Sequence, residues 1–309
     1  MIPFQKSNVK TISSMLWIFI AFLAPVLHGF ANILDNYLTN QRFKNIWTLT
    51  FYSTLFNALF LPFIFFIEVP GIPPVSAVPF LLLVGTIDIL YLFPYYKALQ
   101  SDDTSVVSAL FSLGKILIPL FAFLFVGEQL HLTQYLGFFI LILASASLTL
   151  NHRGVFRLNA SFFYMLLCSI LLAVEAVAYK HLFDQVGWST GFVWATCVST
   201  MVILGFLFVT HIRRDIFKHT KDLKRNAPVF ILEEFLTFGG SAASTYAISL
   251  VPVTLEKSIG AFQPLFVLLY ALVLGKYFPH LFKEQIDRRS ILKKSLIFLI
   301  MIAGVLLVV

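Results

Sequence analysis

The sequence alternates between long apolar blocks and short polar connections. Ten blocks contain few charged side chains, and a helix needs about 20 apolar residues to cross the hydrocarbon core of a bilayer. They run approximately over residues 15–37, 46–67, 77–99, 105–126, 132–150, 160–183, 191–209, 227–250, 252–277 and 290–309. The two-residue alternation typical of membrane β-barrels is absent from them, so helices must satisfy the backbone polar groups. The pattern predicts an all-α integral membrane protein with ten transmembrane helices.

The two halves of the chain repeat the same spacing of features. Lys115 lies twelve residues before Gly127 in the first half, and Gln263 lies twelve residues before Gly275 in the second. Five helices in each half is an odd number, so the second half enters the membrane in the opposite direction to the first. Inverted repeats of this kind are an architecture of secondary transporters. The predicted five-helix repeats are residues 1–155 and 156–309.

Composition and charge agree with a lipid environment. Hydrophobic residues make up 59% of the chain and charged residues 12%, against about 25% charged residues in an ordinary soluble domain. The net charge of +7 comes from basic residues between apolar blocks, whereas a nucleic-acid-binding protein gathers them on a soluble face. We therefore expect a multi-pass protein of the cell (inner) membrane, a monomer or homodimer, with the lipid bilayer and no nucleic acid as a partner.

Three short motifs in the first half point to a known family. They are residues 96–99 (Tyr-Lys-Ala-Leu), the Gly-Glu pair at 127–128, and residues 132–137, which begin the fifth block. Together with a weaker second copy, they resemble the EamA branch of the drug/metabolite transporter superfamily. The resemblance implies an inverted-repeat bundle with a central cavity that moves small organic molecules by alternating access without ATP. The second copy departs from the pattern at Lys276, where the first half has a glutamate.

Four ionisable side chains fall near the middle of apolar blocks, namely His28, Asp88, Lys115 and Glu175. A charge at that depth costs about 3 kcal/mol on insertion scales, so such residues mark a transport pathway by default. Tyr91 and Tyr95 follow Asp88 by three and seven residues, which places all three on one helical face. Asp88 is then a cavity carboxylate that binds a cation or carries a proton, or it is permanently paired with Lys115. Lys115 in turn meets an anionic group of the substrate or neutralises Asp88.

Glu175 is the second intramembrane acid, and Tyr179 follows it one turn later. Removal from water disfavours the charged form of a carboxyl group, so an unpaired glutamate at this depth holds a proton. Glu175 is therefore a candidate proton site beside the substrate. The alternative is a structural ion pair with Lys180 or His181, close to the membrane surface.

A polar face and one amide complete the predicted cavity. His28, Asn32 and Asp35 recur along one face of the first helix, and we expect His28 and Asn32 to contact substrate or to bond a neighbouring helix. Gln263 lies beside Pro264 in the ninth block. Because a proline frees a backbone carbonyl and permits a hinge, Gln263 is a candidate cavity amide.

Four further charged residues are predicted to act as gates or anchors. Glu233 and Glu234 enter the eighth block from its basic connection, and we expect them to be partly wet and paired with Arg and Lys residues there. Glu256 and Lys257 begin the ninth block at the opposite surface. None of the four is expected to be a direct substrate ligand.

These features favour a secondary active transporter, an exporter or exchanger of a small organic metabolite, driven by a proton or counter-solute gradient. The mixed intramembrane charges suit a zwitterion such as an amino acid, and the aromatic lining would also suit a related amine. The alternative is a membrane-embedded lipid-modifying enzyme or a lipid scramblase. The sequence carries no metal-spaced His and Asp cluster and no glycine-rich nucleotide loop, so we expect no catalytic activity, no metal and no cofactor.

Overall fold

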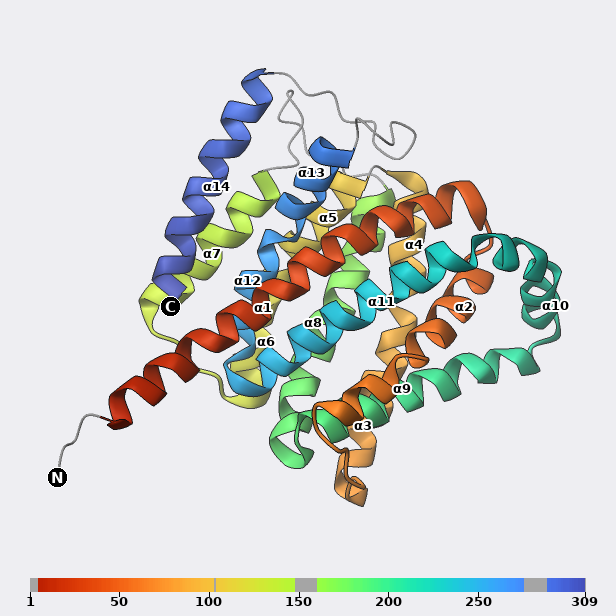
Figure 1. The fold of residues 1–309 in the computed structure, drawn as a ribbon, viewed down its shortest axis with the longest axis horizontal. Helices are drawn as coiled ribbons and strands as arrows, with labels where there is room; N and C mark the ends of the chain where they lie inside the picture. The colour runs from red at the N-terminus through yellow and green to blue at the C-terminus, as the bar shows by residue number, and fades with distance from the viewer. Residues whose placement is uncertain (1–4, 103, 148–159, 275–287, 309) are drawn as a thin grey trace.

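A computed structural model describes residues 5–102, 104–147, 160–274 and 288–308, and they fold as helices without a strand (Figure 1). The first half contains α1 (Gln5–Tyr37), α2 (Ile46–Ala58), α3 (Val78–Leu90), α4 (Leu92–Ser101), α5 (Thr104–Gly114), α6 (Ile118–Val126) and α7 (Leu132–Ser147). The second half contains α8 (Ala160–Val186), α9 (Trp188–Gly205), α10 (Thr210–Lys218), α11 (Thr220–Leu250), α12 (Val253–Ile259), α13 (Gln263–Leu274) and α14 (Arg288–Val308).

Six helical segments among these residues are long and apolar enough to cross a membrane. They are Leu16–Arg42, Ile46–Phe66, Val75–Ser101, Ala160–Val186, Trp188–Phe208 and Val253–Leu274. Three shorter apolar helices accompany them, at Lys115–Val126, Leu132–Ser145 and Leu296–Val308. The predicted all-helical membrane fold is confirmed, whereas the count of ten spans and their division into two inverted repeats stay predictions.

Prolines interrupt three of the predicted blocks. α3 gives way to α4 at Tyr91, α5 to α6 through the 3-10 turn Lys115–Leu117, and α12 to α13 through the 3-10 turn Gly260–Phe262. Pro94, Pro119 and Pro264 follow these breaks by two to four residues. Each proline lacks the N–H that would bond the carbonyl four residues earlier, which explains the local loss of regular helix. The breaks place irregular backbone in the interior of the bundle.

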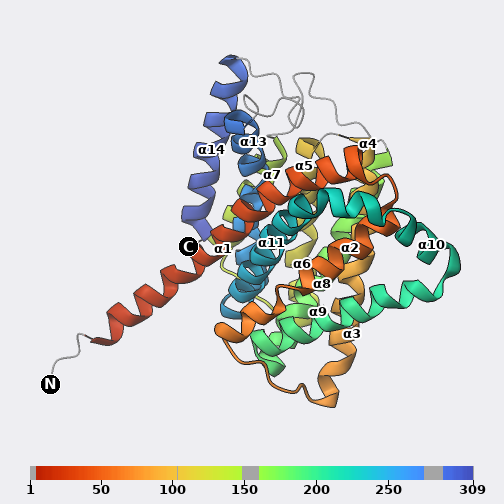
Figure 2. The same cartoon turned by 45° about the vertical axis from the view of Figure 1, so that its right-hand side comes forward.

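The packing between the two halves follows a recurring pattern. α1 runs beside α11, and α8 runs beside α3 and α4; α2 packs on α11, and α9 packs on α3. α7 lies against α14 at one edge of the bundle, as both views show (Figures 1 and 2). Each of these contacts joins one half to the other, so the interior of the bundle is built from both halves.

Side-chain exposure is reversed relative to a water-soluble protein. Large apolar side chains such as Phe19, Phe66 and Leu143 point outward, where lipid would contact them. Carboxyl groups such as Glu175 and Glu233 are buried instead. Buried charges need partners or a functional reason to stay inside, and the interior is therefore the place to look for a functional site.

Candidate functional site

One cavity of about 260 Å³ lies among the helices of both halves. It falls just below the range of about 300–1,000 Å³ that is usual for drug-sized ligands, so it suits a small metabolite. All the residues predicted to bind substrate, to couple transport or to act as gates line this cavity. They are His28, Asn32, Asp88, Tyr91, Tyr95, Lys115, Glu175, Tyr179, Glu233, Glu234, Glu256, Lys257 and Gln263.

The carboxyl group of Asp88, on α3, is held by side chains of the second half. The Ser199 hydroxyl donates to Asp88 Oδ2 over 2.8 Å, and the Tyr179 hydroxyl lies 3.5 Å from the same oxygen. Glu175, on α8, lines the same cavity, close enough for its carboxyl and that of Asp88 to repel each other. Glu175 Oε1 is buried and has no hydrogen-bond donor among the described residues. Two acids from different halves therefore share this part of the cavity.

The structure forms neither of the alternative ion pairs expected for these two acids. Lys115 makes no ion pair within the described part of the chain. Lys180 pairs instead with Asp184, one turn further along α8, at 3.3 Å. The His181 ring lies 2.7 Å from the Gln185 amide nitrogen. Both carboxyls thus line the cavity without an ion pair among the described residues.

A second group of acids lies between α1, α2 and α11. Glu233 and Glu234 are only 2% and 1% exposed, which corrects the expectation that they are partly wet. Ser53 donates to Glu234, Asn57 donates to Glu234 Oε2 over 3.1 Å, and Thr237 donates to Glu233 Oε1 over 2.7 Å. Within the described residues no basic side chain pairs with either glutamate, because one face of α11 turns both inward, away from the basic connection.

The polar face of α1 reaches this second group. The Tyr95 hydroxyl lies 2.9 Å from Asp35 Oδ2 and 3.1 Å from Asn32 Oδ1, and the Asn32 amide donates to Ser108 over 3.2 Å. Asp35 is 6% exposed and lines the cavity beside Asn32. The predicted polar face is present, and it bonds α4 and α5 as well as facing the cavity.

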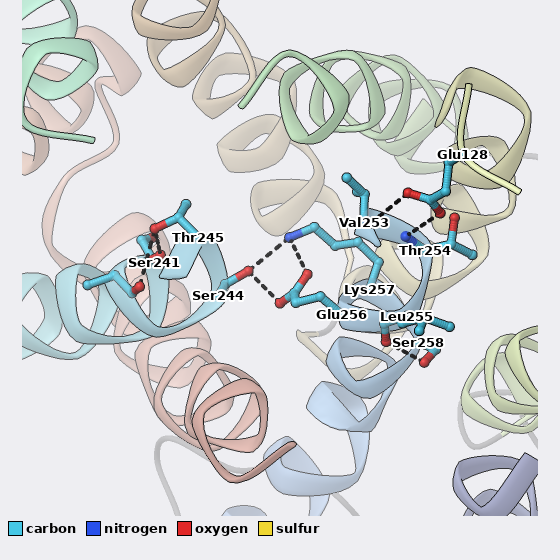
Figure 3. A network of polar contacts seen from close by, with 11 residues as sticks. Glu128, Ser241, Ser244, Thr245, Val253, Thr254, Leu255, Glu256, Lys257 and Ser258 are labelled. Atoms are coloured by element: carbon cyan, nitrogen blue, oxygen red, sulfur yellow. Dashed lines mark hydrogen bonds and ion pairs between the residues drawn. The ribbon is translucent and has the colours of Figure 1, made fainter. Parts of the chain in front are cut away.

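The basic side chains lie at the broken helices. Lys257 Nζ contacts Glu256 Oε2 at 3.0 Å and Ser244 Oγ at 2.9 Å, and Ser244 donates to Glu256 Oε1 over 2.6 Å (Figure 3). Glu256 is 1% exposed, so this pair lies inside the bundle and not at the surface position expected from the sequence. Lys115 Nζ faces Gly260, where an added Cβ would come within 3.0 Å of it. Lys257 therefore has a partner, and Lys115 has no bonded anion in the described part of the structure.

Glu128 fixes the start of α12 from the other half of the chain. Its two carboxylate oxygens accept from the backbone N–H groups of Val253 and Thr254 at 2.8 and 3.1 Å (Figure 3). A helix leaves its first N–H groups without partners, and a carboxylate both satisfies them and complements the helix dipole. Gly127 makes the turn possible, because its φ of 66° is left-handed and a side chain there would be strained. Glu128 thereby positions the helix that carries Glu256 and Lys257.

Comparison with known proteins finds a family model that matches part of this chain. Residues 15–150 match the EamA-like transporter family, which lies in the drug/metabolite transporter superfamily. A search of curated proteins finds no match. One solved structure, titled "Crystal structure of protein", covers 92% of this chain and 97% of its own at a TM-score of 0.59 and 15% identity, which shows similarity of fold alone.

The match over residues 15–150, together with the six long apolar helical segments, points to a multi-pass membrane protein of the transporter type and away from an enzyme. Several residues that line the cavity were not predicted from the sequence. Four of them donate to acids that line the cavity, namely Ser53, Asn57, Ser199 and Ser244. In the sequence each of them is a hydroxyl or an amide inside an apolar block. Many serines in such blocks simply bond their own helix, so this feature does not identify a cavity residue.

Proposed function

We propose that this EamA-like protein is a secondary active transporter that exports or exchanges a small zwitterionic metabolite, such as an amino acid, by alternating access. The proposal rests on the position of Lys115 and on its lack of a bonded anion in the described part of the chain. Its ammonium group borders the cavity and has no bonded anion among the described residues, although an intramembrane charge is costly unless it is compensated. An anionic group of the substrate would supply that compensation.

The charges are distributed unevenly along the cavity, which supports a substrate with two opposite charges. His28 on α1 feels the positive charges of Lys115 and Lys257, whereas Asp35 on the same helix feels the negative charge of Glu233. Seven residues separate His28 and Asp35, about 10 Å along a helix axis. A zwitterion would place its carboxylate toward Lys115 and its ammonium group toward the acids.

Two features of the fold support the proposal of alternating access. The cavity is enclosed by both halves, and the breaks at Lys115–Leu117 and Gly260–Phe262 lie beside it. Discontinuous helices at a repeat interface are typical of substrate sites in secondary transporters. We propose residues 1–155 and 156–309 as two inverted five-helix halves that rock about this site. The transporter would lie in the cell (inner) membrane as a monomer or homodimer, driven by an ion or counter-solute gradient.

Ligand binding to the purified protein tests this function. In detergent, amino acids, their decarboxylated amines and nucleosides are compared by their effect on the melting temperature, because a ligand that binds the folded state raises it. We expect amino acids to raise it, their amines to raise it less, and Lys115→Met to remove the difference. A panel without any effect, in a protein that moves fluorescent lipid between leaflets, would instead support the scramblase alternative.

A further inference from the structure

α10 is a short amphipathic helix in the basic connection between α9 and α11. This connection, residues 210–226, contains six basic and two acidic residues. In both views α10 lies at one end of the bundle, where α9 ends and α11 begins (Figures 1 and 2). Ile212 and Ile216 are 4% and 0% exposed, and the helix packs on α2. The apolar face of α10 is therefore covered by the bundle.

Hydrogen bonds fix the orientation of α10 on α2. The Asn45 amide donates to Asp215 Oδ2 over 2.9 Å, and the Thr48 hydroxyl donates to the Asp215 carbonyl over 3.4 Å. The Tyr52 hydroxyl donates to the Ile216 carbonyl over 3.4 Å. Asn45 also caps α2, because its side-chain oxygen accepts from the Thr48 N–H. The carboxylate of Asp215 is thereby turned toward the bundle, and the opposite face of α10 points away from it.

The outward face of α10 carries basic side chains. Arg213, Arg214 and Lys218 are exposed, and none of them forms an ion pair with a described residue. Lys44 is exposed as well and precedes Asn45, which bonds α10, so it belongs to the same end of the bundle. We call these four residues the basic patch. Like charges so close together are destabilising, and an anionic partner would therefore stabilise this surface.

Exposed aromatic side chains lie next to the basic patch in the chain. Phe208 is 90% exposed and Phe217 is 60% exposed. The segment Trp188–Phe208 is long and apolar enough to cross a membrane, and α10 begins at Thr210, directly beyond its end. α10 therefore starts where the hydrocarbon core gives way to the headgroups. Aromatic and basic side chains are typically found together at that depth.

A phospholipid fits this surface better than a soluble anion does. A soluble anion would neutralise the basic patch but would leave Phe208 and Phe217 in water. A phospholipid supplies a phosphate group for the two arginines, which bind phosphate through paired N–H groups, and acyl chains for the two aromatic rings. An anionic headgroup is favoured over a zwitterionic one, because the zwitterion brings its own cation close to the basic patch.

We propose that α10 is an interfacial helix whose basic patch binds the headgroups of anionic phospholipids in the surrounding leaflet. The four basic residues do not line the cavity, and the inference does not depend on the proposed transport function. Each basic residue near an anionic membrane surface strengthens such binding, and salt screens the attraction. Because α10 is bonded to α2 and continues into α11, the bound lipid holds the ends of two helices that border the cavity.

Lipid binding to the detergent-purified protein tests the site. Anionic dioctanoyl-phosphatidylglycerol and zwitterionic dioctanoyl-phosphatidylcholine are titrated in turn, and native mass spectrometry counts the lipids that stay bound. We expect phosphatidylglycerol to bind at least tenfold more tightly than phosphatidylcholine. The triple variant Arg213→Gln, Arg214→Gln, Lys218→Gln should lose at least about tenfold of that affinity, since it lacks three cations.

Two control variants separate charge at α10 from other effects. The double variant Arg213→Lys, Arg214→Lys keeps both charges, and we expect its affinity for phosphatidylglycerol to stay within about threefold of wild type. Lys180→Gln removes a cation at the other end of α9, where Lys180 pairs with Asp184 at 3.3 Å. This variant should bind phosphatidylglycerol as wild type does.

A photoactivatable phosphatidylglycerol locates the site in wild type, so the test does not depend on the folding of the triple variant. We expect its crosslinks within residues 206–218. Crosslinks only elsewhere, equal affinity of wild type for the two lipids, or undiminished affinity in a folded triple variant would overturn the inference. Inorganic phosphate that displaces the lipid at equal concentration would also overturn it, since the patch would then be a site for soluble anions.

Discussion

The Ser199 hydroxyl, on α9, donates to Asp88 Oδ2, on α3, over 2.8 Å. A matching contact exists elsewhere in the bundle, where Ser53, on α2, donates to Glu234, on α11. In each case the second helix of one half satisfies an acid on the third long helix of the other half. Two cavity acids on opposite halves, one half-buried and one buried, thus hold the halves together by the same chemistry.

We expect the removal of either hydroxyl to lower the stability of the folded protein. A hydrogen bond to a charged or partly charged group contributes about 1.5–3 kcal/mol. The remaining donors, Tyr179 at 3.5 Å from Asp88 Oδ2 and Asn57 on Glu234 Oε2, do not take the place of the lost hydroxyl. We expect Ser199→Ala and Ser53→Ala each to lower the melting temperature of the detergent-purified protein. Ser101→Ala is the matched control, because Ser101 lies at the end of α4, is exposed and bonds only the carbonyl of Lys97, in its own helix. Equal melting temperatures for all three variants would show that these contacts contribute little.

The contact between α7 and α14 depends on two glycines. A Cβ at Gly137 would lie 2.6 Å from the Gly304 carbonyl oxygen, and a Cβ at Gly304 would lie 2.9 Å from Leu141. Overpacking of a close contact costs about 1–3 kcal/mol, so we expect Gly137→Ala to destabilise the protein. Gly205→Ala is the control, because nothing lies within 4 Å of a Cβ there. Thermal unfolding followed by light scattering compares the two, and a Gly137→Ala variant as stable as Gly205→Ala would contradict this packing.

Glu128 should matter for substrate affinity although it does not line the cavity. Its carboxylate caps α12, and the loss of an N-cap costs about 0.5–2 kcal/mol. We expect Glu128→Ala to loosen α12 and to raise the substrate concentration needed for half-maximal exchange, with a smaller effect for Glu128→Gln, which keeps one acceptor oxygen. The exposed Glu68 serves as the matched acid, through Glu68→Ala. Unchanged exchange in Glu128→Ala would show that α12 is positioned by other contacts.

The ionisable residues in the apolar blocks could be predicted from the sequence, because their cost in lipid leaves few places for them but a shared interior. This cost predicts interior positions for Asp88, Lys115 and Glu175, and all three residues line one cavity. The partners of those residues could not be predicted. Whether Asp88 meets Lys115 or Glu175 depends on which faces α3, α5 and α8 turn toward one another, and hydropathy does not encode helix rotation.

The sequence also did not predict how deeply the charged residues at the ends of the apolar blocks are buried. Glu233 and Glu256 both follow a polar connection or a turn, and proximity in sequence suggested surface positions. The structure buries both, because α11 extends as one helix from Thr220 through the basic connection, and because α12 is a short helix that enters the bundle directly after Pro252. Only the three-dimensional path of the backbone distinguishes a residue near the end of a block from one near the membrane surface.

The central claim is that the cavity carries a zwitterion whose anionic group meets Lys115. Exchange in proteoliposomes tests it most directly, with a ¹⁴C-labelled amino acid mixture on one side and unlabelled amino acids or their decarboxylated amines on the other. The account predicts that amino acids drive exchange in wild type, that the amines do so at least tenfold less well, and that Lys115→Met loses amino-acid exchange with an intact fold. Equal exchange by amino acids and amines, or undiminished amino-acid exchange in Lys115→Met, would contradict it.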